Sequence, residues 1–472
     1  MSPYFFFLAL YSFFLIGIGW WTSRQIRNAG DFFVAGRTLS PRYLFATLLA
    51  ANIGAGSTVG AAGLGYEFGF SAWWWVGSAG LGSLILGVTV GPRIWEVAQR
   101  HGFYTVGDFL EFRYNRATRG VIAVLLWFGT LAILAGQLIA VAWILNIVLG
   151  VERYVGALLG GMVMVGYFTF GGLLSAARVN AVQLVVKVVG FGLTMGFLFQ
   201  LFDMWDAFPH LLEPISRTSE SGNFGAFFGG DPGRVFGYVV LLVPSFIISP
   251  GLLQKIYGAR DADTVRKGVV WNGVALMIFA FVPAILGMAA RTHFPELDSR
   301  EMALPMLLTE SLPFWLGGLT LAAVFSAEVS SADAVLFMLS TSLSKDLYQT
   351  FVNPDATEEQ LLRTGRITSV LAGILGVALA VILPSVISAL SIFYSILSVA
   401  LFVPLIAGLY SKRPGSSSAL ATIAGSISIM ITIHFMTSGA GIAGLTPTTW
   451  GIGSAVVIML GSVLVGRPRS AR

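Results

Sequence analysis

Long apolar segments recur from one end of the chain to the other, and they constrain the fold more than any other feature of the sequence. A helix needs about 20 apolar residues to cross the hydrocarbon core of a bilayer. Segments of this length leave no room for a separate soluble domain in a chain of 472 residues, of which 56% are hydrophobic and only 11% are charged. The sequence therefore predicts an all-α integral membrane protein with a single transmembrane domain over residues 1–472.

We expect about thirteen transmembrane helices in this domain. The first apolar segment has no basic residues before it and no small-residue cleavage site after it, so we interpret it as a retained helix rather than a signal peptide. The expected spans cover residues 4–22, 43–69, 71–95, 119–149, 152–171, 176–202, 234–250, 266–290, 313–343, 364–384, 386–410, 416–436 and 448–466.

The basic residues are unevenly divided between the two sets of connections. If the N-terminus lies outside, 22 of the 28 Lys and Arg residues fall on the inner side, five on the outer side and one, Lys187, inside a span. Cytoplasmic connections are the ones enriched in Lys and Arg. We therefore expect a multi-pass protein of the plasma (inner) membrane with its N-terminus outside and its C-terminus in the cytoplasm. The acidic outer connections, 203–233 and 291–312, are expected to form lid-like loops or short interfacial helices.

Several kinds of chemistry lack support in this sequence. Cysteine is absent, which excludes disulfides and thiolate-bound metals. The four histidines are scattered, and the chain has no phosphate-binding loop, nucleophile elbow or paired metal-ligand motif. We therefore expect neither an enzyme nor an ATP-driven pump. The expected partners are the lipid bilayer, a small solute and a coupling ion, with no cofactor, no nucleic acid and no obligate protein partner.

The stretch ANIGAGSTVG at 51–60 places Gly54, Gly56 and Gly60 in the middle of the second span. Backbone groups that a break releases at membrane depth must face protein, an ion or water. The alternative interpretation is close helix packing through small residues. A second interruption favours a break, because LLVPSFIISPG at 241–251 carries Pro244 and Pro250 in the seventh span.

The two interruptions lie five spans apart, which is typical of transporters built from two inverted repeats. The first repeat is expected at 43–202 and the second at 234–410. Residues 4–22 would add one helix before the repeats, and residues 416–466 would add two helices after them. In such folds the broken first helices form the solute and ion sites near the middle of the membrane.

The ninth span carries two adjacent hydroxyls, Ser330 and Ser331, between the acidic residues Glu328 and Asp333. Serine in a membrane helix often bonds only to the backbone of its own helix. Two ionisable side chains within six residues at membrane depth instead indicate a cavity, an ion or a partner.

The sequence resembles the sodium/solute symporter family along essentially its whole length. Members of this family transport sugars, proline, pantothenate, sialic acid and monocarboxylates on a leucine-transporter-type fold. The resemblance rests on FFVAGRTLSP (32–41), AANIGAGSTVG (50–60), YTVGDFLEFRY (104–114), FGGLLSAARVNAVQ (170–183), SPGLLQKIYGARD (249–261), AEVSSAD and SKDLY of the ninth span, and PLIAGLYSKRPG (404–415).

The resemblance implies a sodium site between the second and ninth spans. In the family, two carbonyls of the broken helix bind the ion together with one carbonyl and two hydroxyls of the later helix. By position these ligands fall at Ala50, Ile53, Ala327, Ser330 and Ser331. Five oxygens without a carboxylate suit a monovalent ion that must bind reversibly.

The resemblance also implies solute-binding positions just beyond the ion site. By position they fall at Ser57, Thr58, Trp75, Val76, Ala79, Thr130, Gln137, Ser245 and Ser249. Sugar-transporting members carry acidic or hydroxyl groups where this chain has Val76 and Ala79. A polyol would find few partners there, so we expect a solute other than a sugar.

The chain departs from the family in the sixth span. Asn180 stands where the family usually has an aspartate, which weakens the case for a second sodium site. Lys187 lies near the middle of the same span, where a buried amine needs a partner or a lowered pKa. Three interpretations are open: an ion pair with Glu328 or Asp333, a binding group for a carboxylate substrate, and a carrier of the coupling proton.

We therefore expect a sodium-coupled symporter that imports a small organic solute by alternating access. Lys187 favours a carboxylate or an amino-acid-like solute. The first alternative is a proton-coupled symporter on the same scaffold that uses Lys187 or Glu328. A membrane sensor that binds solute without transporting it is less expected, because no signalling domain follows the last span.

Overall fold

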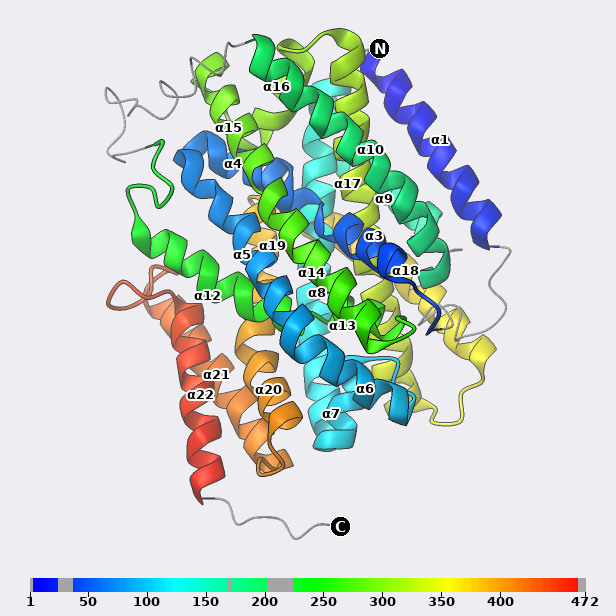
Figure 1. The fold of residues 1–472 in the computed structure, drawn as a ribbon, viewed down its shortest axis with the longest axis vertical. Helices are drawn as coiled ribbons and strands as arrows, with labels where there is room; N and C mark the ends of the chain where they lie inside the picture. The colour runs from blue at the N-terminus through cyan, green and yellow to red at the C-terminus, as the bar shows by residue number, and fades with distance from the viewer. Residues whose placement is uncertain (1–2, 24–36, 169–171, 202–223, 466–472) are drawn as a thin grey trace.

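A computed structural model shows the chain as a bundle of helices (Figure 1). It describes residues 3–23, 37–168, 172–201 and 224–465, and no β-strand occurs in these ranges. The helices are α1 (Pro3–Ser23), α3 (Pro41–Asn52), η2 (Ala55–Ser57), α4 (Val59–Phe68), η3 (Gly69–Ala72), α5 (Trp73–Ile85), η4 (Leu86–Val90), α6 (Gly91–His101), α7 (Val106–Arg113), α8 (Arg116–Leu149), α9 (Arg153–Phe168), α10 (Gly172–Leu201), α12 (Pro232–Ile248), α13 (Pro250–Tyr257), α14 (Ala262–Phe279), α15 (Phe281–His293), η5 (Arg300–Met302), α16 (Ala303–Glu310), α17 (Phe314–Thr341), η6 (Ser342–Val352), α18 (Glu358–Ile382), α19 (Val386–Ile396), η7 (Leu397–Leu401), α20 (Phe402–Tyr410), α21 (Ser416–Met436) and α22 (Pro447–Val465).

The helical membrane fold is confirmed, but the expected number of thirteen spans is not. In the described ranges, ten helical stretches are long and apolar enough to cross a membrane. One of them, Ala55–His101, joins parts of two expected spans, because short 3₁₀ and π-helical turns connect α4, α5 and α6. Two further helices, α1 and α9, contribute shorter apolar stretches.

The connections rich in Arg and Lys meet at one end of the bundle. Arg37 donates to the carbonyl of Phe103 at 3.0 Å, and Arg113 donates to the carbonyls of Gly408 and Ser411 at 3.0 and 2.7 Å. Figure 1 shows α6, α7 and the end of α22 there, whereas α1 starts at the opposite end. The structure thus gathers these connections as the expected topology requires, while the orientation of the termini stays a prediction.

The helix that carries Ser330 and Ser331 lies in the middle of the bundle. In the most apolar window of Phe314–Val352, which begins with α17, 94% of residues are buried, against 28% in Ser416–Met436. The neighbours of α17 include α10, α8 and α3. Helix α17 is therefore central, whereas α21 lies at the edge of the bundle, where lipid can cover its apolar side chains.

Both expected helix breaks are present. Helix α3 ends at Asn52, and Ile53 and Gly54 are extended before α4 starts at Val59. Helix α12 ends at Ile248, and α13 restarts with Pro250, which has no N–H and therefore suits a first helical position. One break lies near the start of each expected repeat, although the repeat boundaries themselves stay a prediction.

The acidic connections at the other end are only partly described. Residues 291–312 contain η5 and α16, and Arg300 there forms an ion pair with Glu67 of α4. This agrees with the expected short helices. Most of the connection 203–233, and the basic residues at 24, 27, 467, 469 and 472, lie outside the described residues.

Candidate functional site

The break between α3 and α4 lies directly against α8 and α17. A Cβ atom on Gly54 would lie 2.1 Å from Ser331 Oγ and 2.9 Å from Gln137 Oε1. The same Gln137 oxygen accepts a hydrogen bond from the backbone N–H of Ala55 at 2.9 Å. Position 54 therefore requires glycine, because two neighbouring helices close onto its backbone.

The two serines of α17 bond to the broken end of α3. Ser330 Oγ lies 2.7 Å from the carbonyl oxygen of Ala50 and 3.1 Å from that of Ala327. Ser331 Oγ donates to the carbonyl of Ala51 at 2.8 Å. The serines therefore face the backbone oxygens that the break exposes, as the resemblance implies for an ion site.

The amine of Lys187, on α10, lies among the same oxygens. Its Nζ donates to the carbonyls of Ala50 and Ile53 at 2.6 and 3.0 Å and to Ser330 Oγ at 2.6 Å. Lys187 is only 1% exposed. Because an ammonium has three N–H donors, these three acceptors satisfy it completely. Three of the five groups implied for sodium are thus bonded to a cationic group of the chain itself.

The first of the three interpretations of Lys187, an ion pair with α17, is not seen in the described residues. No ion pair joins Lys187 to Glu328 or Asp333. Instead, Glu328 Oε1 lies 2.7 Å from Thr58 Oγ1, which is also 2.9 Å from the carbonyl oxygen of Gly54. Hydrogen bonds of Thr58 therefore link the carboxyl group of Glu328 to the backbone of the break, near the residues that Lys187 contacts.

Two further polar residues of α10, Asn180 and Gln183, are buried in the bundle. Asn180 Nδ2 donates to Thr47 Oγ1 at 3.1 Å. Gln183 is fully buried, and neither of its amide atoms has a hydrogen-bond partner among the described residues. Asn180 thus helps to hold α10 against α3 about two turns before the Lys187 contacts.

A cavity of about 100 Å³ opens beside the break. Thr58 does not line it, Ser245 bonds to Ser398 Oγ at 2.6 Å, and Thr130 lines a separate, smaller cavity. The other solute positions implied by the resemblance do line it: Ser57, Trp75, Val76, Ala79, Gln137 and Ser249. That these residues bind solute stays a prediction.

Sequence reasoning missed Lys255 as a lining residue of this cavity. The expected seventh span ends at residue 250, which predicts that Lys255 lies in an inner connection. The structure instead restarts a helix at Pro250 and leaves Lys255 3% exposed inside the bundle. The break between α12 and α13 could have indicated this position. A helix that restarts within the membrane keeps its first turns, and therefore Lys255, at membrane depth.

A charged network closes the end of the bundle where the basic connections meet. Arg119 forms ion pairs with Asp346, Asp108 and Glu111 at 2.8, 2.9 and 2.8 Å. Thr105 Oγ1 donates to Asp346 at 2.6 Å. These contacts join α7, α8 and η6 across that end.

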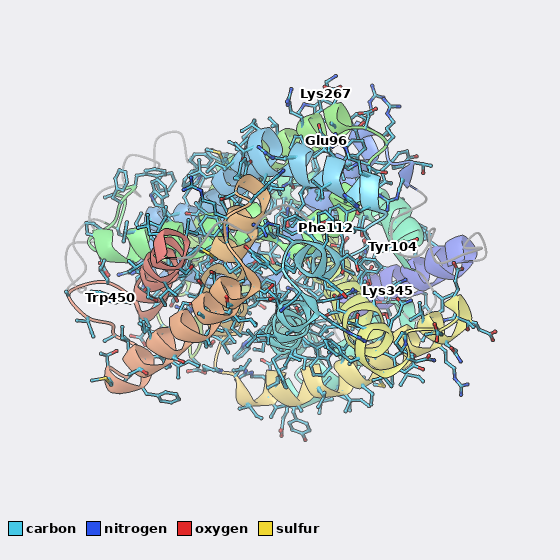
Figure 2. All side chains as sticks on the ribbon, turned by 90° about the horizontal axis from the view of Figure 1, so that it is seen from below. Glu96, Tyr104, Phe112, Lys267, Lys345 and Trp450 are labelled. Atoms are coloured by element: carbon cyan, nitrogen blue, oxygen red, sulfur yellow. The ribbon has the colours of Figure 1, made fainter. Side chains whose placement is uncertain are left out.

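Cavities lie on both sides of this network. A small cavity of about 20 Å³ touches Asp346 and shares Met338 with the cavity beside the break. Beyond the network, a depression of about 630 Å³ is lined by residues that include Tyr104, Phe112 and Lys345. Figure 2 shows these three side chains near the middle of this end, with Lys267 at its edge. The network therefore separates the cavity beside the break from the surface at this end.

Comparisons with known proteins agree with this architecture. The model of the sodium:solute symporter family matches residues 32–425. The sodium/glucose cotransporter of Vibrio parahaemolyticus is 25% identical over 91% of this chain and 84% of its own length. The sodium/pantothenate symporter of Escherichia coli is 25% identical over 88% of this chain and 87% of its own. The chain spans 60% of the length of several animal sodium/glucose cotransporters.

A solved structure shows the same fold. The substrate-bound, outward-open Na⁺-coupled sialic acid symporter superposes with a TM-score of 0.78 at 17% identity, over 99% of this chain and 98% of that one. The matched proteins are sodium-coupled transporters rather than enzymes, and they support sodium-coupled solute symport as the activity of the group.

Proposed function

Because this chain belongs to the sodium:solute symporter family, we propose that it imports a small organic solute by alternating access around the α3–α4 break. We further propose that the Lys187 ammonium supplies the positive charge at the position that the resemblance assigns to sodium. The observation that carries this proposal is the set of three hydrogen bonds from Lys187 Nζ to Ala50, Ile53 and Ser330.

A fixed ammonium and a sodium ion compete for the same oxygens. Each carries one positive charge, and each is stabilised by carbonyl and hydroxyl oxygens. Two unit charges about 4 Å apart repel each other by about 4 kcal/mol even at an effective dielectric constant of about 20. A sodium ion would therefore bind only after the amine of Lys187 had left Ala50 and Ile53. This favours transport that does not need sodium. The coupling ion would then be the proton, which the sequence offered only as the alternative to sodium.

The second candidate is sodium-coupled symport, in which the amine moves aside during the cycle. Two observations favour it: the adjacent hydroxyls of Ser330 and Ser331 face the break, and the matched relatives are sodium symporters. The two candidates differ in one measurable property, the response of the unmodified protein to sodium.

Thermal unfolding of the detergent-purified full chain in sodium or in potassium chloride distinguishes these candidates. We expect equal melting temperatures for the wild type, since Lys187 already fills the site. The Lys187→Ala variant should gain a sodium-specific stabilisation, because the carbonyls of Ala50 and Ile53 lose their donor. At a sodium concentration of about ten times Kd, that stabilisation amounts to about 1.4 kcal/mol.

The matched control for this experiment is Val188→Ala, a lipid-facing change next to Lys187 that should not create a sodium response. A wild type that sodium stabilises more than potassium would reject the first candidate in favour of the second. Uptake into sodium-free proteoliposomes under an inward proton gradient would identify the proton as the driving ion.

A further inference from the structure

The cavity beside the break contains a buried cation, Lys255, that the site around Lys187 does not use. Lys255 Nζ donates one hydrogen bond, to the carbonyl of Thr47 at 2.7 Å. It forms no ion pair with a carboxylate in the described ranges. An ammonium has three N–H donors, so two of them lack a protein partner in this part of the chain. A buried charge in this state is costly unless a ligand completes its contacts.

We infer that Lys255 binds the carboxylate of the transported solute and that this solute is a monocarboxylate with an apolar body. The inference deepens the proposed function and rests on it. Lys255 lines the same cavity as four residues that supply polar groups: Ser57, Gln137, Ser249 and Ser331. The first turn of α13 also lines it through Gly251 and Leu252, and the N-terminus of a helix favours an anion.

The remaining walls of the cavity determine the rest of the solute. They are formed by aromatic and aliphatic side chains, among them Trp75, Phe246, Val335, Phe393 and Tyr394. Such walls suit an alkyl or aryl group and offer few partners for a chain of hydroxyls. The cavity of about 100 Å³ suits a small molecule.

The lining also separates a simple carboxylate from an amino acid. No Asp or Glu occurs among the described residues that line the cavity. The ammonium of an amino acid would therefore meet no carboxylate there, whereas the carboxylate end meets Lys255. We expect the acid without an α-amino group to bind better than the corresponding amino acid.

Binding to the detergent-purified full chain tests this inference with matched compounds. The first set is 3-phenylpropionate, 3-phenylpropionamide and L-phenylalanine, and the second is 4-methylpentanoate, its amide and L-leucine. Glucose serves as the polyol. We expect at least one acid to raise the melting temperature saturably, with an affinity at least about tenfold higher than its amide, because a charge-assisted hydrogen bond is lost in the amide.

Two variants assign this preference to Lys255. Lys255→Met keeps a similar volume without the charge and should bind acid and amide equally. Lys267→Met, at an exposed position, should behave as the wild type. If Lys255→Met does not fold, the acid-to-amide ratio of the wild type still decides the matter.

Several outcomes would overturn the inference. It is contradicted if acid and amide stabilise the wild type equally, if glucose alone stabilises it, or if no acid changes its melting temperature. A preference for the acid that persists in Lys255→Met would show that Lys255 is not the binding group. None of these results bears on the sodium response or on uptake into proteoliposomes, so a failure of the proposed function would be seen separately.

Discussion

The Gly54→Ala variant is expected to lose about 3 kcal/mol of folding free energy and all measurable solute uptake. The added Cβ would lie 2.1 Å from Ser331 Oγ and 2.5 Å from Ser331 Cβ. Neither atom can move away freely, because Ser331 lies on the central helix α17 and its hydroxyl bonds to Ala51. The melting temperature and uptake into proteoliposomes measure the two effects.

A second substitution on α17 tests the cause of this loss. In Gly54→Ala/Ser331→Gly both clashing atoms of Ser331 are gone, so the double variant should be more stable than Gly54→Ala although each single change destabilises. Gly453→Ala, on α22, is the matched control, because a Cβ there has no neighbour within 4 Å. A Gly54→Ala variant with the melting temperature of the wild type would show that α17 does not close onto the break.

The breaks and the serine pair could be predicted because few structures accommodate them. A run of glycines or a proline at membrane depth either breaks a helix or lets two helices pack closely. The resemblance implied that Ser330 and Ser331 face the broken helix, and the structure places them against the break. The two interruptions together were sufficient to predict the breaks, whereas the position of the serines against the break came from the resemblance.

The hydrogen-bond partners of the buried lysine side chains could not be predicted from the sequence. A lysine can reach several groups around its own helix, so its partner depends on how the neighbouring helices pack. From the sequence, Glu328 and Asp333 were candidate ion-pair partners of Lys187. In the structure α10 packs against α3 and α17, and Lys187 donates its hydrogen bonds to Ala50, Ile53 and Ser330.

The number of spans and some of the solute positions also depend on how the helices pack, which the sequence does not determine. Hydropathy does not show whether α4, α5 and α6 are joined by turns or by loops, so the total of thirteen spans was not confirmed. Thr58 was expected to face solute, but the structure turns it toward Glu328. A short hydroxyl side chain changes its partner with a small rotation of the helix, which the sequence does not determine.

The Arg119→Met variant is expected to destabilise the protein by about 3–5 kcal/mol and to open the end of the bundle that carries the network. Arg119 is the cation shared by Asp346, Asp108 and Glu111, and its side chain is 10% exposed. Removal of the guanidinium leaves Asp346, with 8% side-chain exposure, as a buried charge without its partner. Breaking a buried ion pair on one side costs much more than removing both partners.

Labelling of one introduced cysteine measures this opening, because the native chain contains no cysteine to compete. Ser342 lines the small cavity above the network, so a thiol in Ser342→Cys should react slowly in the wild-type background and much faster together with Arg119→Met. Arg119→Met/Asp346→Leu should recover stability, since it removes the unpaired charge. Arg260→Met, in an exposed pair with Asp261, is the control and should change stability by less than about 0.5 kcal/mol. Equal labelling rates in all backgrounds would mean that another contact closes this end and that the network only stabilises the fold.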